Sequence, residues 1–212
     1  MKERIIEEEN TSRKLLISAS TVFAEKGYRK ATVAEICERA GTNIAAVNYY
    51  FGSKEALYSE SWLYAFRTSI AAHPLDGGIA AEATAEERLR CYIKATLQRA
   101  VAEENADFRI MTNEMAQPTG LLDVVTHESI MPLLKMLEGV IRELIGHDAD
   151  EMYVHCCGIS IMNQCVHPMI EQTWGHSTTK KHFAPPVAID IESFTEHVFR
   201  FSLAGIYEYR SR

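Results

Sequence analysis

The chain has 212 residues and a mass of 23.9 kDa, with 47% hydrophobic and 24% charged residues. This is enough for one large domain or two small ones, and the composition excludes a disordered or fibrous protein. The 22 basic and 29 acidic residues give a formal net charge of −7, which over the whole chain argues against a general nucleic-acid-binding protein.

The N-terminal segment and the cysteines favour a cytoplasmic location. Residues 1–10 are charged and lack the apolar stretch of a secretory signal. The five cysteines are an odd number without any Cys-x-x-Cys spacing, which indicates reduced thiols. Residues 152–170 contain no charged Lys, Arg, Asp or Glu and are about long enough to cross a bilayer. Polar residues inside this segment, such as His155 and Asn163, favour a helix buried by protein on several sides over a membrane span.

Helical periodicity dominates the sequence, and no alternation of apolar and polar residues is long enough to predict a sheet. We therefore predict an all-α fold. The first helix is expected over residues 12–26, followed by Gly27 as a left-handed cap. Thr32 and Glu35 have the spacing of a capping box, which predicts the start of a second helix.

The second helix and a short third helix have the pattern of a helix-turn-helix. The second helix is expected to end at Gly41, and Asn43 is a favourable N-cap for the third. A fourth helix is predicted to begin after Ser53. The third helix is short enough to enter the DNA major groove, which is about 12 Å wide.

The remaining two-thirds of the chain also has a helical pattern. Thr84 and Glu87 form a second capping box, and Pro132 suits a first helical position better than an interior one. Residues 175–190 are predicted to form a loop, and the last helix is apolar nearly all round, which is typical of a central helix or one shared with another subunit. The helices are expected over residues 84–100, 106–116, 119–127, 132–145, 152–170 and 191–209.

Four motifs in residues 12–60 occur together in one register. They are Phe23-Ala-Glu-Lys-Gly-Tyr28, Ala31-Thr-Val-Ala-Glu-Ile36, Ala40-Gly41 and Tyr49-Tyr-Phe-Gly-Ser-Lys-Glu-Ala-Leu57. This segment closely resembles the N-terminal domain of the tetracycline-repressor (TetR) family of bacterial regulators, and residues 43–58 also resemble the branch that contains the CecR-type regulators.

The resemblance implies a transcriptional regulator with two domains. Residues 1–60 would form a three-helix helix-turn-helix domain that binds a palindromic operator in double-stranded DNA. Residues 61–212 would form a helical bundle that binds a small-molecule effector and pairs its last two long helices with a second copy. Repression, relieved when the effector alters the spacing of the two DNA-binding domains, is the usual behaviour of the family.

The resemblance also assigns DNA contacts to individual residues. The phosphate-contacting positions, whose side chains all donate hydrogen bonds, are occupied by Thr32, Tyr49, Tyr50 and Lys54. The base-facing start and middle of the recognition helix are occupied by Thr42, Asn43, Ile44, Ala45 and Asn48. The family often has an aromatic residue in place of Asn48 and His in place of Tyr50, so the operator sequence is not predicted. The alternative roles are capping for Thr32 and packing for the two tyrosines.

The local charge removes the objection to DNA binding. Residues 10–60 contain seven basic and five acidic residues, a net charge of +2, whereas residues 61–212 contain 13 basic and 20 acidic ones. The acidic excess therefore belongs to the C-terminal part.

An effector pocket is expected inside the C-terminal bundle. Methionine and aromatic side chains are suited to an adaptable apolar site, so we expect a hydrophobic or aromatic effector. The alternative is a methionine-rich core without a ligand. The candidate pocket residues are Tyr92, Phe108, Met111, Met115, His155, Met162 and Trp174, with Asn113 and Gln164 as further polar anchors.

Two other classes of function are weighed against a ligand-responsive regulator. A metal or redox sensor would use Cys156, Cys157, Cys165 and the neighbouring histidines, but adjacent helical residues point about 100° apart and cannot all face one ion. A helical enzyme is the second alternative, although no phosphate-binding glycine loop, His-Glu-x-x-His or nucleophile-elbow motif occurs. We therefore expect no catalysis, no metal and no cofactor.

Overall fold

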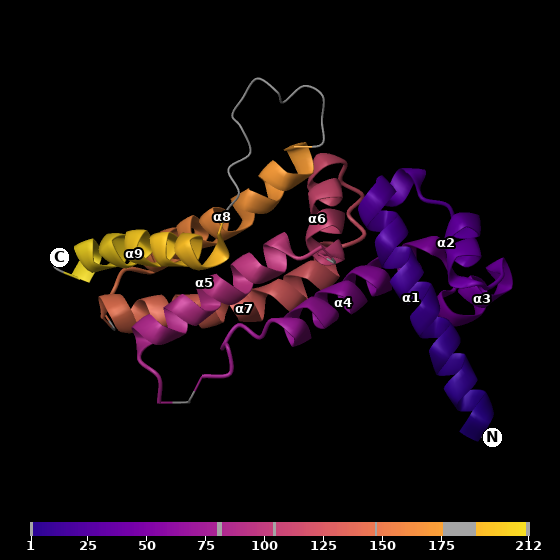
Figure 1. Cartoon of the computed structure of the whole chain (residues 1–212), viewed down its shortest axis with the longest axis horizontal. Coiled ribbons are helices and arrows are strands. Elements are labelled where there is room, and N and C mark those ends of the chain that lie inside the picture. Colours follow the sequence, from indigo (N-terminus) through magenta and orange to yellow (C-terminus); the bar gives the residue numbers. More distant parts are fainter. Residues whose placement is uncertain (1, 80–81, 104, 147, 176–189, 211–212) are drawn as a thin grey trace. The chain divides into compact units, whose positions relative to one another are not determined.

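The computed structural model describes residues 2–79, 82–103, 105–146, 148–175 and 190–210, which form helices and no strand (Figure 1). The predicted all-α fold is confirmed. The chain forms two compact units: unit 1 comprises Met1–Ser69 and Glu104–Ile130, and unit 2 comprises Ile70–Glu103 and Met131–Arg212. The division at residue 60 into DNA-binding and effector domains stays a prediction, because the compact units follow packing and include residues 104–130 in unit 1.

Unit 1 begins with the long helix α1, Lys2–Lys30, which starts earlier than the sequence pattern predicted. Its regular geometry breaks at Gly27, where φ is 71° and ψ is 169°. Glycine adopts this positive φ without the Cβ clash that other residues would suffer. The prediction of a left-handed cap that ends the helix at Gly27 is wrong in detail, because ψ is far from the left-handed helical value and three further residues of α1 follow it.

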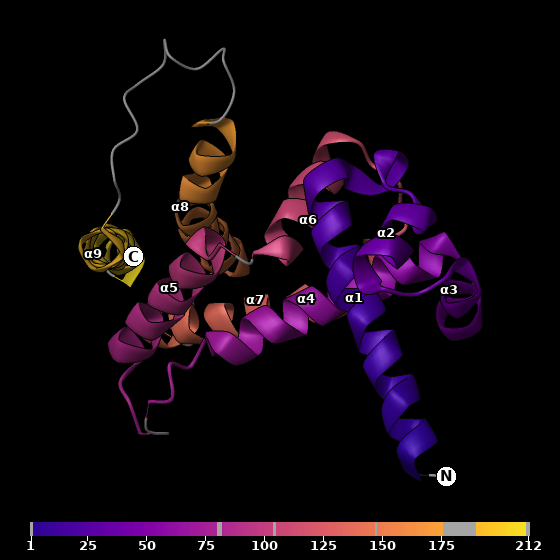
Figure 2. The same cartoon turned by 45° about the vertical axis from the view of Figure 1, so that its right-hand side comes forward.

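Helices α2, Val33–Ala40, and α3, Ile44–Phe51, form the helix-turn-helix beside α1 (Figure 2). The Thr32 hydroxyl accepts a hydrogen bond from the Glu35 amide (3.2 Å), and the Asn43 side chain accepts one from Ala46 (3.1 Å). Gly41 ends α2 in the left-handed conformation, at φ 65° and ψ 37°. The expected capping box is incomplete, because the Glu35 carboxylate pairs with Lys26 Nζ at 2.6 Å.

Helices α4, Lys54–Ala72, and α6, Ala106–Ala116, complete the core of unit 1. Aromatic rings dominate this core: the Tyr58 and Phe23 ring centroids are 4.8 Å apart in an edge-to-face arrangement, and Trp62 stacks on Phe66 at 5.1 Å. The Trp62 Nε1 donates to the Asp107 carbonyl oxygen (3.2 Å), which joins α4 to the beginning of α6. Helix α1, which packs on α6, also contacts α2 and α3.

Unit 2 contains α5, Ala85–Val101, α8, Glu151–Gly175, α9, Ile191–Arg210, and most of α7, Asp123–Ile145. Helices α8 and α9 both pack on α5 (Figure 1). The predicted capping box at the start of α5 is present, since Glu87 Oε2 accepts from the Thr84 amide at 2.8 Å and Thr84 Oγ1 accepts from the Glu87 amide at 3.2 Å. The core includes Leu89, Ile93, Leu137, Ile141, Val198 and Ile206.

The sequence prediction is wrong at α7. Residues 119–127 and 132–145 were expected to form two helices with Pro132 at the start of the second, but one helix runs from Asp123 to Ile145 with Pro132 inside it. Proline leaves the carbonyl four residues earlier without its amide partner. Both Pro132 and Glu128 are exposed. Water can therefore reach the side of α7 on which the hydrogen bond is lost.

In the single chain, helix α8 is buried along one stripe, and its burial on several sides, which would need a second copy, stays a prediction. Val154, Ile161 and Cys165 are buried, whereas Met152 and Ile159 are exposed. None of the helices in the described ranges combines the length and apolar character needed to cross a bilayer. The predicted loop at 175–190 lies outside the described residues over 176–189.

Candidate nucleic-acid interface

The outer surface of α3 carries the exposed residues of the helix-turn-helix. Val47 is buried and fixes the inner side of the helix, while Ile44 and Tyr49 are 52% and 70% exposed. Ala45 and Asn48 are exposed as well. Eight residues of α-helix are about 12 Å long, so this surface has the dimensions of a major-groove reader.

Asn48 has the side chain best suited to base recognition on this surface. It is exposed, and its amide forms no side-chain hydrogen bond within the described part of the chain. The amide can therefore donate and accept together at an adenine edge. Asn43 is more restricted, because its Oδ1 already caps the Ala46 amide and only its NH₂ group remains for DNA.

Thr42 is placed differently from the other predicted base contacts. Its hydroxyl oxygen is buried and has no hydrogen-bond partner in the described residues. The turn after Gly41 directs this side chain inward, so its rotamer must change before it can reach a base.

The predicted phosphate contacts at Thr32, Tyr49 and Tyr50 lie near the two ends of the motif. Thr32 Oγ1 accepts a hydrogen bond as the N-cap of α2, which leaves its O–H free to donate to phosphate. The rings of Tyr49 and Tyr50 meet edge to face, with centroids 4.9 Å apart. Tyr50 is half-buried and Tyr49 is the more exposed of the two, so the packing role fits Tyr50 better.

Lys54 contacts the end of α1. Its Nζ donates to the Tyr28 carbonyl oxygen at 2.7 Å and lies 4.3 Å from the centroid of the Tyr28 ring. Burial lowers the pKa of Lys54 below its ordinary value. The ammonium group therefore stabilises the C-terminal end of α1 in this structure, a contact that sequence reasoning missed because it joins residues 26 positions apart.

Two further cations lie next to this surface. Arg29 and Lys30 are exposed in the last turn of α1, directly before the N-cap Thr32. They contribute to the positive local charge of residues 10–60, but the resemblance assigns them no contact. Their position near the N-terminus of α2 suits phosphate binding, because free amides and cations there attract anions together.

The predicted effector residues fall in both units. Phe108, Met111 and Met115 lie on α6 in unit 1, whereas Tyr92, His155 and Met162 belong to unit 2. Met115 is 78% exposed, which contradicts its assignment to the interior of a bundle. His155 is also exposed, and its Nδ1 is 2.9 Å from Glu138 Oε1. Trp174 lies outside the residues whose side chains are described.

Tyr92 and Met162 are candidate pocket residues that contact each other. The Tyr92 hydroxyl is 3.6 Å from the Met162 sulfur and donates to the Leu133 carbonyl oxygen at 3.3 Å. Tyr92 is almost fully buried, and burial raises its pKa above the ordinary value. The two predicted polar anchors instead bond to backbone: Asn113 donates to carbonyls of α1, and Gln164 donates to the Ser160 carbonyl.

The cysteines of α8 do not converge. Cys165 is buried, Cys157 is half-buried and Cys156 is exposed. Burial raises the pKa of Cys165 to about 12 and also raises that of Cys157, which disfavours the thiolate that metals and oxidants require. Within the described ranges, no three His, Cys, Asp or Glu side chains are grouped as a metal site.

Helices α8 and α9 each carry exposed apolar residues. Met152, Tyr153 and Ile159 are exposed on α8, and Phe201 of α9 is 65% exposed. The opposite side of α9 is buried through Val198, Phe199 and similar residues. The exposed side of α9 also carries Glu192, Arg200 and Glu208, so the prediction of a last helix that is apolar nearly all round is wrong.

Comparison with known families matches both parts of the chain. Residues 15–60 match the family described as "Bacterial regulatory proteins, tetR family", and residues 85–206 match "HTH-type transcriptional dual regulator CecR, C-terminal domain". The HTH-type transcriptional dual regulator CecR of Shigella flexneri is 30% identical over 159 residues, which cover 69% of this chain and 70% of that protein.

Solved structures share the fold. FadR of Bacillus subtilis, determined in complex with stearoyl-CoA, matches with a TM-score of 0.68 and 21% identity, covering 91% of this chain and 98% of that one. The TetR family regulator PfmR of Thermus thermophilus matches with a TM-score of 0.63 and 20% identity, covering 90% of this chain and 97% of that one. At these identities the likeness concerns the fold alone.

Proposed function

Because this chain belongs to the TetR family of transcriptional regulators and has a CecR-type C-terminal domain, we propose that it is a homodimer that binds a palindromic operator and is released by a small molecule. The observation that carries the proposal is the exposed surface of α3, on which Ile44, Ala45, Asn48 and Tyr49 lie side by side along a helix of groove-filling length.

The two groups of residues on the helix-turn-helix have different tasks. Asn43, Ile44, Ala45 and Asn48 face base edges, and Ile44 and Ala45 are suited to the thymine methyl group. Thr32, Tyr49 and Lys54 contact phosphates, with Tyr50 as a weaker candidate, and we add Arg29 and Lys30 to this group. Thr42 is the weaker candidate among the base-facing residues. Phosphate contacts fix the register of the protein on DNA, whereas base contacts provide the specificity.

A second copy of the chain covers the exposed apolar surface of α8 and α9. Burying a side chain such as Phe201 contributes roughly 1.5–3 kcal/mol, which a monomer forgoes. The resulting dimer presents two α3 helices, and both reach one face of B-DNA when they are about 34–36 Å apart or a multiple of that distance. An effector that binds more tightly to a conformation with another spacing favours release.

The effector is a hydrophobic or aromatic molecule held by unit 2, in which buried aliphatic residues surround Tyr92. Repression follows from the usual behaviour of the family. The relative in Shigella flexneri is named a dual regulator, so activation at other promoters is the second candidate role.

The experiment is selection of bound fragments from the source genome by the purified protein, combined with sedimentation. The proposal expects enrichment of sites with inverted repeats and a dimer at micromolar concentration. Failure to enrich any sequence contradicts the DNA-binding function, whereas a monomeric protein that still enriches sites contradicts only the dimer. Genes next to the enriched sites then supply the compounds to test for release.

A further inference from the structure

The exposed side of α8 carries a regularly spaced row of residues, here called the α8 seam. Its members recur at intervals of four, three and four residues, and they are Met152, Cys156, Ile159 and Asn163. A turn of 3.6 residues places the four side chains within about 60° of one another around the helix axis. Alternating intervals of four and three form the heptad pattern of helices that pair with other helices, and in this pattern Asn163 occupies an a position.

Helix α9 carries a second row with the same spacing, here called the α9 seam. Its members recur at intervals of three, four and three residues, and they are Phe194, His197, Phe201 and Ala204. Three of the four are exposed, and Phe194 is half-buried. The His197 ring stacks between the rings of Phe194 and Phe201, with centroid distances of 6.0 and 6.2 Å. Helices α8 and α9 contact each other, so one unit presents two heptad seams.

The charges near the seams point to a second copy of this chain as the partner that covers them. The chain has a net charge of −7, and two copies repel each other unless they meet through uncharged surface. The α8 seam and the residues between its members include no Lys, Arg, Asp or Glu. Beside the α9 seam, Glu192 pairs with Lys94 at 2.5 Å and Glu196 pairs with Arg90, both within the chain. Charge pairs, which select partners in many coiled coils, are thus absent from the α8 seam.

Asn163 is the polar member of the α8 seam. Its Nδ2 donates a hydrogen bond to the Ile159 carbonyl oxygen at 3.0 Å. A carboxamide has two N–H donors and an oxygen with two lone pairs. Among the residues that the structure describes, Oδ1 and the second N–H of Asn163 have no partner. If a second copy covered the seam without offering a polar group here, these atoms would be buried and unsatisfied, which is unfavourable.

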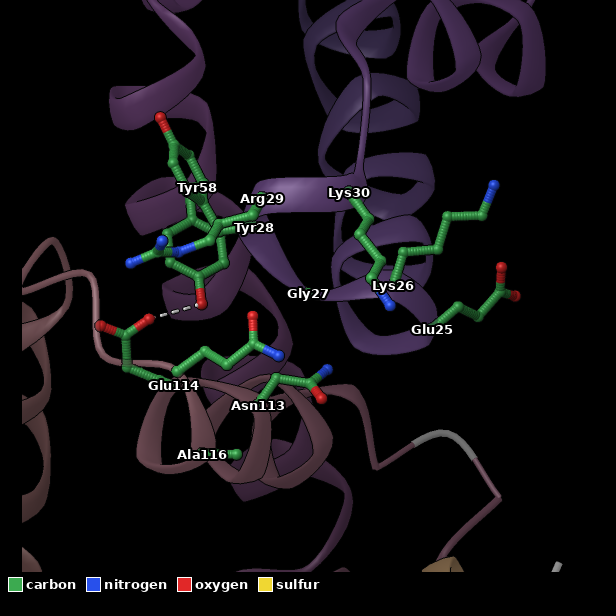
Figure 3. Close-up of a pocket in the computed structure, with 11 residues that line it drawn as sticks. Glu25, Lys26, Gly27, Tyr28, Arg29, Lys30, Tyr58, Asn113, Glu114 and Ala116 are labelled. Atoms are coloured by element: carbon green, nitrogen blue, oxygen red, sulfur yellow. Dashed lines mark hydrogen bonds between the residues drawn. The ribbon is translucent and has the colours of Figure 1, made fainter. Parts of the chain in front are cut away.

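Two polar side chains of unit 1 show how this chain satisfies such groups between its own helices. The Asn113 Nδ2 of α6 donates to two carbonyl oxygens of α1, at 3.2 and 3.0 Å. The Glu114 carboxylate accepts from the Tyr58 hydroxyl (2.9 Å) and the Thr119 amide (2.6 Å), and Figure 3 shows the contact with Tyr58. Burial raises the pKa of Glu114, but its hydrogen bonds outweigh burial and lower the pKa below the ordinary value. Asn163 has no such partner on another helix in the described residues, so its partner must come from the second copy.

We propose that Asn163 is a specificity-determining residue of the homodimer, whose amide hydrogen-bonds to a polar group of the second copy and fixes the register in which the two chains pair. The inference rests on the proposed homodimer. Apolar side chains such as Met152 and Ile159 pack at several offsets along a seam, whereas an amide at an a position is satisfied at only one. Because the register determines the distance between the two α3 helices, it also determines whether the dimer fits its operator.

The test uses three variants of the full-length protein. Asn163→Leu removes the amide at nearly constant volume, and Asn163→Asp keeps the shape but adds a charge. Gln164→Leu is the matched control, because the Gln164 amide likewise donates to the carbonyl four residues earlier, at 3.2 Å, but points about 100° away from the seam. Since Asn163 is exposed in the single chain, its replacement leaves the core of unit 2 intact.

Two quantities are measured for each variant. The first is the dissociation constant of the dimer, obtained by sedimentation over a dilution series. The second is the affinity of fully dimeric protein for a DNA duplex that the wild type has enriched from genomic fragments. A residue that only contributes packing changes both quantities in the same direction, whereas loss of register makes the dimer tighter and its binding to the duplex weaker.

We expect the two Asn163 variants to differ in sign. Asn163→Asp raises the dimer dissociation constant at least about tenfold at neutral pH, because two like charges enter an uncharged contact. Asn163→Leu lowers the dimer dissociation constant about tenfold, since an apolar residue replaces a polar one in the seam. It nevertheless weakens duplex binding about fivefold, because only a fraction of its dimers has the register that fits DNA. Gln164→Leu keeps both quantities within about twofold of the wild type.

Two results would overturn the inference while leaving the homodimer intact. An unchanged dimer dissociation constant in Asn163→Asp would place Asn163 outside the contact. In Asn163→Leu, either a weaker dimer or a tighter dimer with wild-type affinity for the duplex would show that the amide does not set the register. A monomeric wild type contradicts the proposed homodimer, and this inference with it. A dimeric wild type that enriches no duplex contradicts DNA binding alone, and the dimer dissociation constants of the two Asn163 variants then support or overturn the inference by themselves.

Discussion

The DNA-binding part and the effector-binding part of this protein differ in how their sites are built. The candidate DNA contacts lie within residues 29–54, and five of them are on one eight-residue helix whose inner side is fixed by Val47. The candidate effector residues are spread over helices of both units, and two of them, Met115 and His155, are exposed. A site on the outside of one helix is specified locally, whereas a site enclosed by several helices depends on how they pack.

The largest expected effect separates packing from DNA contact within the helix-turn-helix. Ile36 of α2 is fully buried and Ile44 of α3 is 52% exposed. Ile36→Ala should destabilise unit 1 by about 2–5 kcal/mol and abolish DNA binding through unfolding. Ile44→Ala should change stability by less than about 0.5 kcal/mol and still weaken DNA binding. Chemical denaturation and DNA titration of both variants check this, and equal stability losses contradict the assigned faces of the two helices.

Asn48→Ala tests base recognition. Loss of the amide should cost about 1–3 kcal/mol at one position of each half-site and relax the base preference there. Selection from a randomised library, repeated with the variant, measures the preference position by position. Binding that weakens uniformly across all sequences would assign Asn48 to a phosphate or structural role.

Lys54→Ala distinguishes phosphate binding from the contact with Tyr28. If Lys54 contacts phosphate, the slope of log K against log salt concentration becomes smaller in magnitude by about one for each subunit. Loss of the hydrogen bond to the Tyr28 carbonyl also lowers stability by about 1 kcal/mol. A lower stability with an unchanged salt slope means that Lys54 supports α1 and does not reach DNA.

The smallest expected effect is a pH dependence at Glu114. Its pKa is lowered below 4.5 in the folded chain, so the carboxylate contributes stability above the unfolded-state pKa and loses it as the pH falls through the folded-state value. Between neutral pH and the acid range the wild type should therefore lose more stability than Glu114→Gln. Parallel denaturation curves of the two proteins at every pH would contradict this assignment.

The sequence predicted local features well because short-range chemistry determines them. Thr32, Asn43 and Thr84 each accept the expected capping hydrogen bond, and Gly41 has the expected left-handed conformation. Pro132 was misassigned because a preference for the first turn is weaker than the packing that carries α7 through residues 123–145. Helix boundaries are thus predictable where a cap exists and uncertain where packing decides.

The contacts of unit 1 were beyond sequence reasoning for a different reason. Asn113 was assigned to an effector pocket, but it caps α1, and Lys54 was assigned to phosphate alone, although it also bonds Tyr28. Each contact joins residues far apart in the chain, and no pattern within one helix specifies the partner. The exposure of Asn48 and Tyr49, in contrast, could be predicted from the register of α3 alone.

Hydrogen exchange of the free and operator-bound protein tests the central claim most directly. We predict slower exchange on DNA binding in residues 32–54, which include α2, α3 and the start of α4, and unchanged exchange in the exposed surface of α8 and α9. Protection of α8 and α9 by DNA, with none in residues 32–54, would contradict the assignment of α3 as the DNA-reading helix.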